Sequence, residues 1–249
     1  MLDFQARLST SSGGFFIPPF ISSSHLSVAP LQEQACCSRN HGRQRLNLRE
    51  SVNIVLYLNS RREKLMIEKN IQAILSENRR LLQTVVHESA GDLIRLIKKS
   101  RAIFFCAQGR SGFVLRCFCM RLMHLGYQVY FCGETITPAI GENDLLFVLS
   151  GSGHTTSTFE MVQIAKKKGA MTCGILANLH SRISPLLDKT IHIPGTTKLG
   201  LKSEPHSLQM DGSLFEQSAF IFLEAVVLTL YQEKIKETEG FSELHAVIE

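Results

Sequence analysis

No run of apolar residues in the sequence reaches the length of about 18 to 20 that a membrane-spanning helix needs. The apolar stretch nearest the amino terminus, 15–21, is interrupted by Pro18 and Pro19. A transmembrane protein is therefore disfavoured, and we expect a soluble chain with no membrane partner.

The seven cysteines contain no Cys-x-x-Cys pair, the spacing typical of zinc sites and of dithiol redox motifs. Most of them lie inside apolar segments, where a free cysteine behaves as a small hydrophobic residue. The nine histidines are scattered, with no His-x-x-x-His pair on a helix. We therefore expect a protein of the reducing cytoplasm that binds no metal.

The charge distribution gives little support to a nucleic-acid partner, although the formal net charge is +5. Lysines and arginines are dispersed in small clusters such as Arg61-Arg62 and 166–168, and a solvated surface explains such clusters best. Hydrophobic residues make up 44% of the chain and charged residues 20%, which are the proportions of a globular protein.

Residues 1–65 differ from the rest because they are rich in serine, contain prolines and have few acidic residues before Glu50. Three interpretations remain: a disordered tail, an organelle transit peptide, or an over-extended reading frame. We favour the third, since codons for Arg61, Arg62 and Glu63 can form a purine run at the distance of a bacterial ribosome-binding site before Met66. The expected organisation is an extension over 1–65, a domain over 66–236 and a tail over 237–249.

From Met66 onward, helical apolar periodicity alternates with short apolar runs. Such runs suit strands buried on both faces, and their alternation with helices predicts a doubly wound parallel sheet in a three-layer α/β sandwich. The expected strands are 102–107, 128–132, 145–149, 171–176 and 189–193, and the expected helices are 66–86, 89–99, 111–125, 155–168, 181–187 and 212–236.

Two strand exits carry glycines and hydroxyls. Residues 107–112 read AQGRSG after the first strand, and residues 150–157 read SGSGHTTS after the third. Because parallel sheets bind ligands beyond the carboxyl ends of their strands, and helix amino termini attract anions, this pattern predicts a phosphate cradle. Simple helix capping by serine and threonine is the alternative. Neither loop is a Walker A motif or a Gly-x-Gly-x-x-Gly fingerprint, so a small phosphorylated metabolite is preferred over a nucleotide.

Five motifs together carry a family resemblance: GRSG at 109–112, MRLMHLG at 120–126, GETITPAI at 133–140, SGSG at 150–153 and MDGSLFEQS at 210–218. The segment 66–236 resembles the sugar isomerase (SIS) domain family, and within it the 6-phospho-3-hexuloisomerases. The resemblance implies a flavodoxin-like sheet of five parallel strands, a homotetramer, and cofactor-free interconversion of a 3-ketose and a 2-ketose phosphate.

Glu216 is the expected catalytic base. Moving a carbonyl from C3 to C2 requires a base for the C2 proton, and a carboxylate partly withdrawn from water among apolar neighbours is suited to that task. Glu216 has such neighbours in the sequence and occupies the glutamate of the family's SLFEQ motif. A plain first-turn acidic residue, placed for the helix dipole, is the alternative.

The resemblance also implies the other site residues. His124 is expected to join the active site across a subunit interface and to assist ring opening or proton transfer. Three residues, Arg110, Glu134 and Thr135, are expected to border the sugar, although Arg110 could equally pair with an acidic residue. The expected phosphate contacts are Gly109, Ser111, Ser150, Ser152, Thr155 and Ser157, with backbone from Gly151–Gly153.

Three positions depart from the family pattern: Gln108, His154 and Asp211. None coincides with the expected base or histidine, so they bear on affinity and pH profile more than on reaction class. Two other functions stay open. One is an aldose–ketose isomerase of the same superfamily, and the other is a sugar-phosphate-sensing transcription regulator, which would need an amino-terminal helix-turn-helix.

Overall fold

The structure is a computed structural model that describes residues 48–85, 87–202 and 204–237. The chain divides into two compact units, Met1–Ser51 and Val52–Glu249. The described part of the first unit is only the beginning of helix α1, which runs over Leu48–Leu82.

The centre of the second unit is a parallel sheet with strand order β2-β1-β3-β4-β5. Every residue of β1 and β3 is buried, which explains why these strands read as unbroken apolar runs rather than as alternating patterns. The prediction of a doubly wound parallel sheet is confirmed. The strands are β1 (Ile103–Cys106), β2 (Val129–Phe131), β3 (Leu145–Ser150), β4 (Met171–Leu176) and β5 (Lys189–His192).

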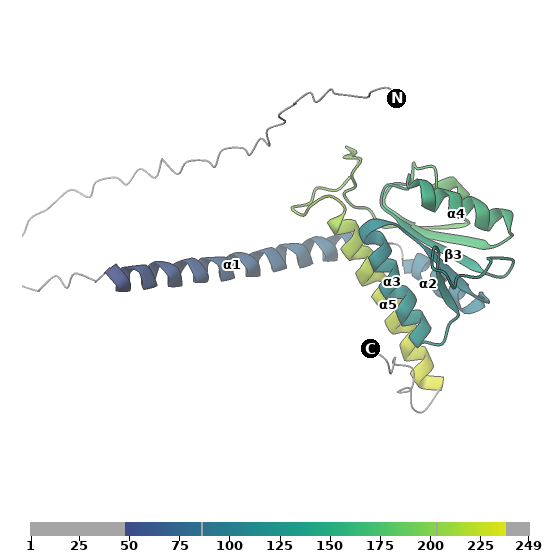
Figure 1. The fold of residues 1–249 in the computed structure, drawn as a ribbon, viewed down its shortest axis with the longest axis horizontal. Helices are drawn as coiled ribbons and strands as arrows, with labels where there is room; N and C mark the ends of the chain where they lie inside the picture. Colours follow the sequence, from purple (N-terminus) through teal and green to yellow (C-terminus); the bar gives the residue numbers. More distant parts are fainter. Residues whose placement is uncertain (1–47, 86, 203, 238–249) are drawn as a thin grey trace, which may run out of the picture. The chain divides into compact units, whose positions relative to one another are not determined.

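Helices cover both faces of the sheet (Figure 1). One face packs against α2 (His87–Lys99), α3 (Gly109–His124) and α5 (Ser213–Glu237), and the other against α4 (Thr156–Lys167) and the 3₁₀ helix η1 (Ser184–Leu186). Alternate residues of β1 and β3 enter the two cores, as a pleated strand requires. The three-layer sandwich expected from the sequence is therefore confirmed, and the order in which strands are added to the sheet reverses between β1 and β3.

Helix α1 begins earlier than the sequence pattern suggested. It starts at Leu48 instead of near residue 66, and it ends at Leu82 instead of near 86, so residues 48–65 are helical where no helix was expected. This stretch contains neither glycine nor proline, and many of its side chains are exposed, so local propensity rather than an apolar stripe accounts for the helix. The interpretations given for 1–47 and for the tail 238–249 lie outside the described residues.

Helix α5 is long and apolar enough, by length and composition alone, to span a membrane, which the search for apolar runs had not indicated. Packing against the sheet accounts for part of the apolar character of α5. Leu214, Phe215, Leu223, Val226 and Leu230 are all buried in the core on the sheet. The central helix of a globular domain passes the same test.

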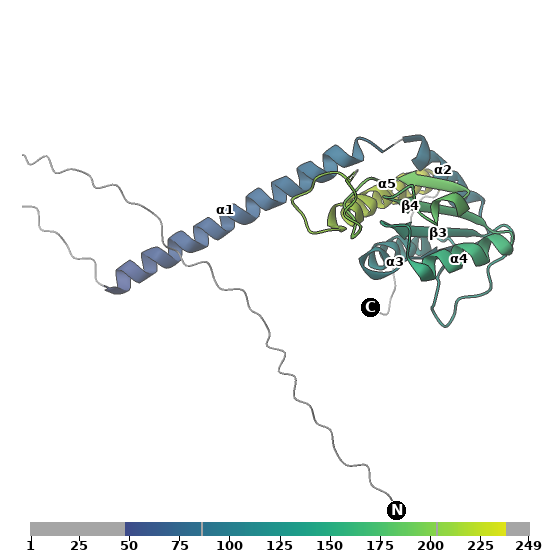
Figure 2. The ribbon, with the colours of Figure 1, turned by 90° about the horizontal axis from the view of Figure 1, so that it is seen from above.

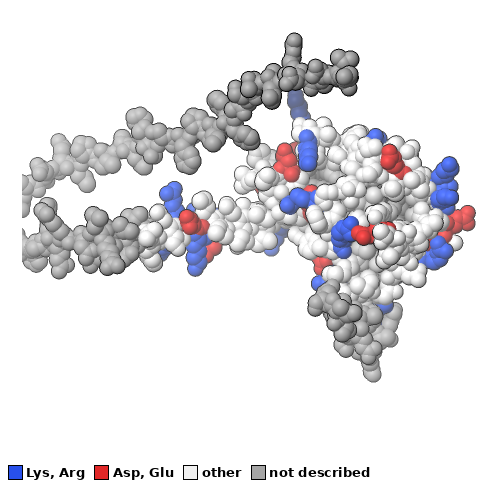
Figure 3. Space-filling view, in the orientation of Figure 1, with Lys and Arg blue, Asp and Glu red and all other residues white. Residues whose placement is uncertain are grey.

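Surface charge agrees with the dispersed pattern in the sequence. On the face drawn in Figure 3, basic and acidic side chains are interspersed. Some charged side chains of the described residues form partly exposed ion pairs, such as Lys166 with Asp188 at 2.7 Å. Exposed pairs of this kind contribute little to stability.

Asp144, just before β3, gives a pH-dependent contribution to stability. Burial alone would raise the pKa of its carboxyl, but hydrogen bonds from Arg101 (2.9 and 2.7 Å) and from the Gly141 N–H (2.9 Å) outweigh burial and hold the pKa below its ordinary value. A lowered folded-state pKa stabilises the fold above the unfolded-state pKa of about 3.9, and this contribution is lost as the pH falls through the folded-state pKa.

We therefore expect Asp144→Asn to lower the free energy of unfolding by about 1 to 3 kcal/mol at pH 7, because a charge-assisted network is lost. The difference from wild type should shrink below about pH 4 as Asp144 is protonated. Urea unfolding at a series of pH values measures both. A difference that stays constant from pH 7 to pH 3 would contradict the assignment.

Candidate active site

A short loop joins the carboxyl end of β1 to the amino terminus of α3, which therefore lies at the carboxyl end of the sheet. Gly109 has a φ of +60°, and the helix amino-terminal residue Gln108 makes no capping hydrogen bond through its side chain. A Cβ on Gly112 would come within 3.1 Å of the Ala107 carbonyl oxygen, so the helix starts close against the strand. Because the Gln108 side chain does not cap the helix, the first N–H groups of α3 can donate hydrogen bonds to a ligand.

The loop after β3 is held by its own hydroxyls. Ser150 Oγ accepts a hydrogen bond from the Gly153 N–H (3.1 Å), and Ser152 Oγ accepts one from the His154 N–H (3.2 Å). Each hydroxyl used as an acceptor keeps its own proton to donate to an anion. Thr155, at the start of α4, makes no side-chain capping bond. Simple capping therefore does not account for Thr155, and binding of a phosphate group by this loop stays a prediction.

The loop between β5 and α5 forms a third wall and lies against the second half of α1 (Figure 2). The buried carboxylate of Glu77 in α1 accepts hydrogen bonds from Ser207 Oγ, the Leu208 N–H and Gln209 Nε2 at 2.8 to 2.9 Å. Burial raises the pKa of Glu77, but these bonds outweigh burial and hold it below its ordinary value. Helix α1 thereby fixes the approach to the first turn of α5.

These three loops enclose a cavity of about 310 Å³ beyond the carboxyl ends of β1 and β3, where the strand order reverses. Its lining unites eight residues predicted from the sequence: Gly109, Arg110, Ser111, Ser150, Gly151, Ser152, Thr155 and Glu216. The remaining lining residues are Gln108, Leu149, Thr196, Thr197, Lys198, Asp211, Gly212 and Phe215.

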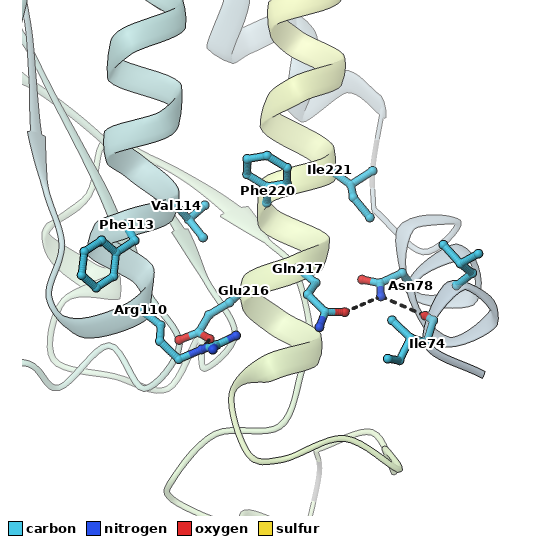
Figure 4. A pocket seen from close by; sticks show the side chains of 10 residues that line it. Ile74, Asn78, Arg110, Phe113, Val114, Glu216, Gln217, Phe220 and Ile221 are labelled. Atoms are coloured by element: carbon cyan, nitrogen blue, oxygen red, sulfur yellow. Dashed lines mark hydrogen bonds and ion pairs between the residues drawn. The ribbon is translucent and has the colours of Figure 1, made fainter. Parts of the chain in front are cut away.

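Glu216 lies in the first turn of α5, with 13% of its side chain exposed. Its Oε2 accepts a hydrogen bond from Arg110 Nε at 2.5 Å, which makes an ion pair between α3 and α5 (Figure 4). Leu214 and Phe215 are buried beside Glu216, as expected. The sequence left two roles open for Arg110, bordering the sugar or pairing with an acidic residue, and the structure shows the pairing. The carboxylate is therefore held in place at the edge of the cavity.

The ion pair also borders a second, apolar cavity of about 460 Å³ between α1, α3 and α5 (Figure 4). Across it, Asn78 donates to Gln217 Oε1 at 2.9 Å and accepts from Ser218 Oγ at 2.7 Å. Phe113, whose side chain is largely exposed, and Phe220 are among the apolar residues that line this cavity. Arg110 and Glu216 thus separate a polar cavity from an apolar one.

Four predicted site residues lie outside the polar cavity of this chain. His124 is in the last turn of α3, 14 residues beyond Arg110 and therefore roughly 21 Å along the helix. Glu134 pairs with Arg116 at 2.5 Å on the surface, and Thr135 is exposed beside it. Ser157 is in the first turn of α4 but does not line the cavity.

Sequence reasoning missed Thr196, Thr197 and Lys198, which line the cavity from the loop after β5. The signal was present: these residues follow a strand exit, and ligands collect at the carboxyl ends of parallel strands. Among residues 48–85, 87–202 and 204–237, no cluster of three or more His, Cys, Asp or Glu side chains is arranged to hold a metal ion.

Comparison with known proteins agrees with this architecture. Residues 96–204 match the SIS domain family. The chain is 38% identical over 183 residues to a 3-hexulose-6-phosphate isomerase of Mycobacterium gastri, covering 74% of this chain and 92% of the relative. It is 34% identical over 179 residues to the enzyme of that name from Bacillus subtilis, covering 72% and 97%.

A solved structure gives the same result. A crystal structure of a protein from Methanococcus jannaschii, for which a 3-hexulose-6-phosphate isomerase function is inferred, superposes with a TM-score of 0.61 at 31% identity. The match covers 73% of this chain and 99% of that one. The chain belongs to the SIS-domain family of 3-hexulose-6-phosphate isomerases.

Proposed function

We propose that this protein interconverts D-arabino-hex-3-ulose 6-phosphate and D-fructose 6-phosphate. The observation that carries the proposal is the polar cavity, which is lined by two helix amino termini, several hydroxyls and one carboxylate held by Arg110. The first group of features suits a phosphate dianion, and the carboxylate suits proton transfer at carbon.

The reaction follows from this placement. With the phosphate in the cradle, Glu216 takes the proton from C2 of the 3-ketose, the electrons of that C–H bond form the C2–C3 double bond, and the C3 carbonyl oxygen takes up a proton to give an enediol. The carbon-bound proton then returns from Glu216 to C3, while the C2 hydroxyl loses its proton and becomes the carbonyl. The proton lost at O2 balances the proton gained at O3. No electrons enter or leave, so no redox cofactor is required. Arg110 keeps the carboxylate oriented through its bond to Oε2.

Replacing Ser152 with Ala is expected to weaken binding of fructose 6-phosphate. The loss should be about 0.5 to 1.5 kcal/mol for one neutral hydrogen bond, and more if the lost partner is a charged phosphate oxygen. Isothermal titration calorimetry measures it. An unchanged dissociation constant would count against the phosphate assignment of this loop.

The proposed reaction is tested by incubating the protein with enzymatically made hexulose phosphate and following fructose 6-phosphate in a coupled assay. Pentose and heptose phosphates tested in parallel address the aldose–ketose alternative. A gel shift on DNA addresses the regulator. DNA binding without turnover of any sugar phosphate would overturn the proposal.

We further propose a cytoplasmic homotetramer in which His124 reaches a neighbouring subunit's cavity. Apolar side chains around the second cavity support an interface there, since Leu75 is 54% exposed, Phe113 71% and Ile221 41%. Free thiols, among them Cys106 and Cys173, fit a reducing compartment. Light scattering of the purified protein tests the oligomer, and a monomer at assay concentration with full activity would contradict it.

A further inference from the structure

Lys198 lines the polar cavity, and its backbone lies in a hydrogen-bonded turn. It follows Thr197, whose N–H and hydroxyl both donate to the Glu204 carboxylate, at 2.9 and 2.5 Å. A turn closes around Lys198, because the Gly200 N–H donates to the Thr197 carbonyl at 3.2 Å and the Leu199 N–H to Thr197 Oγ1 at 3.1 Å. The backbone of this lysine is therefore positioned, while its side chain is exposed.

The loop that carries Lys198 lies against the phosphate cradle. A Cβ built on Gly151, in the middle of the SGSG segment, would stand 3.6 Å from Thr197 Cγ2. Lys198, the next residue, lines the same cavity as Ser150 and Ser152. A lysine side chain is a compact charge on a flexible stem, so it can follow an anion placed over that loop.

The charges of the cavity lining suggest that Lys198 balances the charge of a bound phosphate group. The charged residues of the lining are Arg110, Lys198, Asp211 and Glu216. Arg110 is bound to Glu216, so its charge is already matched within the protein. Over the described ranges 48–85, 87–202 and 204–237, no ion pair joins Lys198 to a carboxylate. A phosphate monoester brings a charge of about −1.5 to −2 at pH 7, which hydroxyls and helix termini only partly balance.

We propose that Lys198 is a phosphate-binding residue that sets the preference of this site for phosphorylated over unphosphorylated sugars. The inference rests on the proposed function, because it assigns the charge that holds the substrate of that reaction. Lys198 binds the phosphate group and takes no part in proton transfer at C2 or C3. Its loss therefore weakens binding and leaves the chemical step intact.

The test compares Lys198→Met with Lys202→Met, which removes an exposed lysine of the same loop that does not line the cavity. Calorimetry measures dissociation constants for fructose 6-phosphate, inorganic phosphate and fructose. Lys198→Met should weaken the first two by about 10- to 100-fold, the range for a charge-assisted hydrogen bond. Binding of fructose should not change. Lys198→Arg, which keeps the charge, should lie nearer to wild type, and Lys202→Met should match wild type.

The kinetic readout separates binding from chemistry. At saturating hexulose phosphate, kcat of Lys198→Met should remain close to that of wild type while KM rises. A fall in kcat with unchanged dissociation constants would overturn the inference, because it would place the lysine on the enediolate. Equal losses in Lys198→Met and Lys202→Met would overturn it as well.

Failure of the proposed function has a different signature. If wild type turns over no hexulose phosphate, yet phosphate and fructose 6-phosphate bind in a Lys198-dependent manner, the reaction is misassigned and the phosphate contact stands. If turnover occurs and Lys198→Met binds phosphate as wild type does, the reaction stands and the contact is refuted.

Discussion

Glu216→Gln is expected to lower kcat by about 10²- to 10⁴-fold, the contribution typical of a positioned general base. Glutamine keeps the size of the side chain and an oxygen for Arg110 Nε, which lies 2.5 Å from the carboxylate. It cannot accept the C2 proton. The dissociation constant for fructose 6-phosphate should therefore stay within a few-fold of wild type, which calorimetry on the same preparation measures.

The matched control is Glu224→Gln. It makes the same chemical change on the same helix, about two turns further along and outside the cavity lining. We expect wild-type kcat from it. If Glu216→Gln also retained wild-type kcat, the base would lie elsewhere. If it instead lost binding and thermal stability together, the carboxylate would serve mainly to join α3 to α5.

The strands of the sheet were predictable because their residues are buried on both faces. In β3, six consecutive buried residues leave no alternation, and a short apolar run followed by glycines is typical of a strand in a covered parallel sheet. The cradle loops were predictable for a related reason, since the positive φ of Gly109 and Gly153 is a local property that glycine signals in the sequence.

The third wall of the cavity was not predictable in this way. It depends on contacts between distant residues, such as Glu77 with Ser207 and Asn78 with Ser218. A glutamate within a helix reads as a solvated surface residue, and nothing local shows that three donors from another loop will meet it. The start of α1 at Leu48 was missed because that stretch shows no sustained apolar stripe.

The ion pair between Arg110 and Glu216 shows where motif reasoning stops. The motif picked out Glu216, and the strand exit picked out Arg110. Their contact depends on how α3 and α5 lie side by side, which sequence spacing does not encode. The structure thus identifies Arg110 as the residue that positions Glu216, which the sequence alone did not show.

Gly153→Ala is expected to disrupt the phosphate cradle. Gly153 has a φ of +64°, which disfavours any side chain, and an added Cβ would stand 2.5 Å from the Cβ of Ser181 and closer still to its hydroxyl. Ser181 is buried and cannot move aside freely. Strain and overpacking together should cost about 2 to 4 kcal/mol of unfolding free energy, measured by urea denaturation. Binding of fructose 6-phosphate, measured by calorimetry, should fall with it.

Two further variants separate the effect of backbone strain at Gly153 from the effect of the steric clash with Ser181. Gly141→Ala adds the same methyl group where no atom lies within 4 Å of it, and it should leave stability and binding near wild type. Adding Ser181→Gly to Gly153→Ala removes the clashing atoms and leaves only the backbone strain, so it should restore part of both losses. A Gly153→Ala protein that behaved like Gly141→Ala would show that this loop tolerates a side chain. The close contact between the loop and Ser181 would then not be needed for phosphate binding.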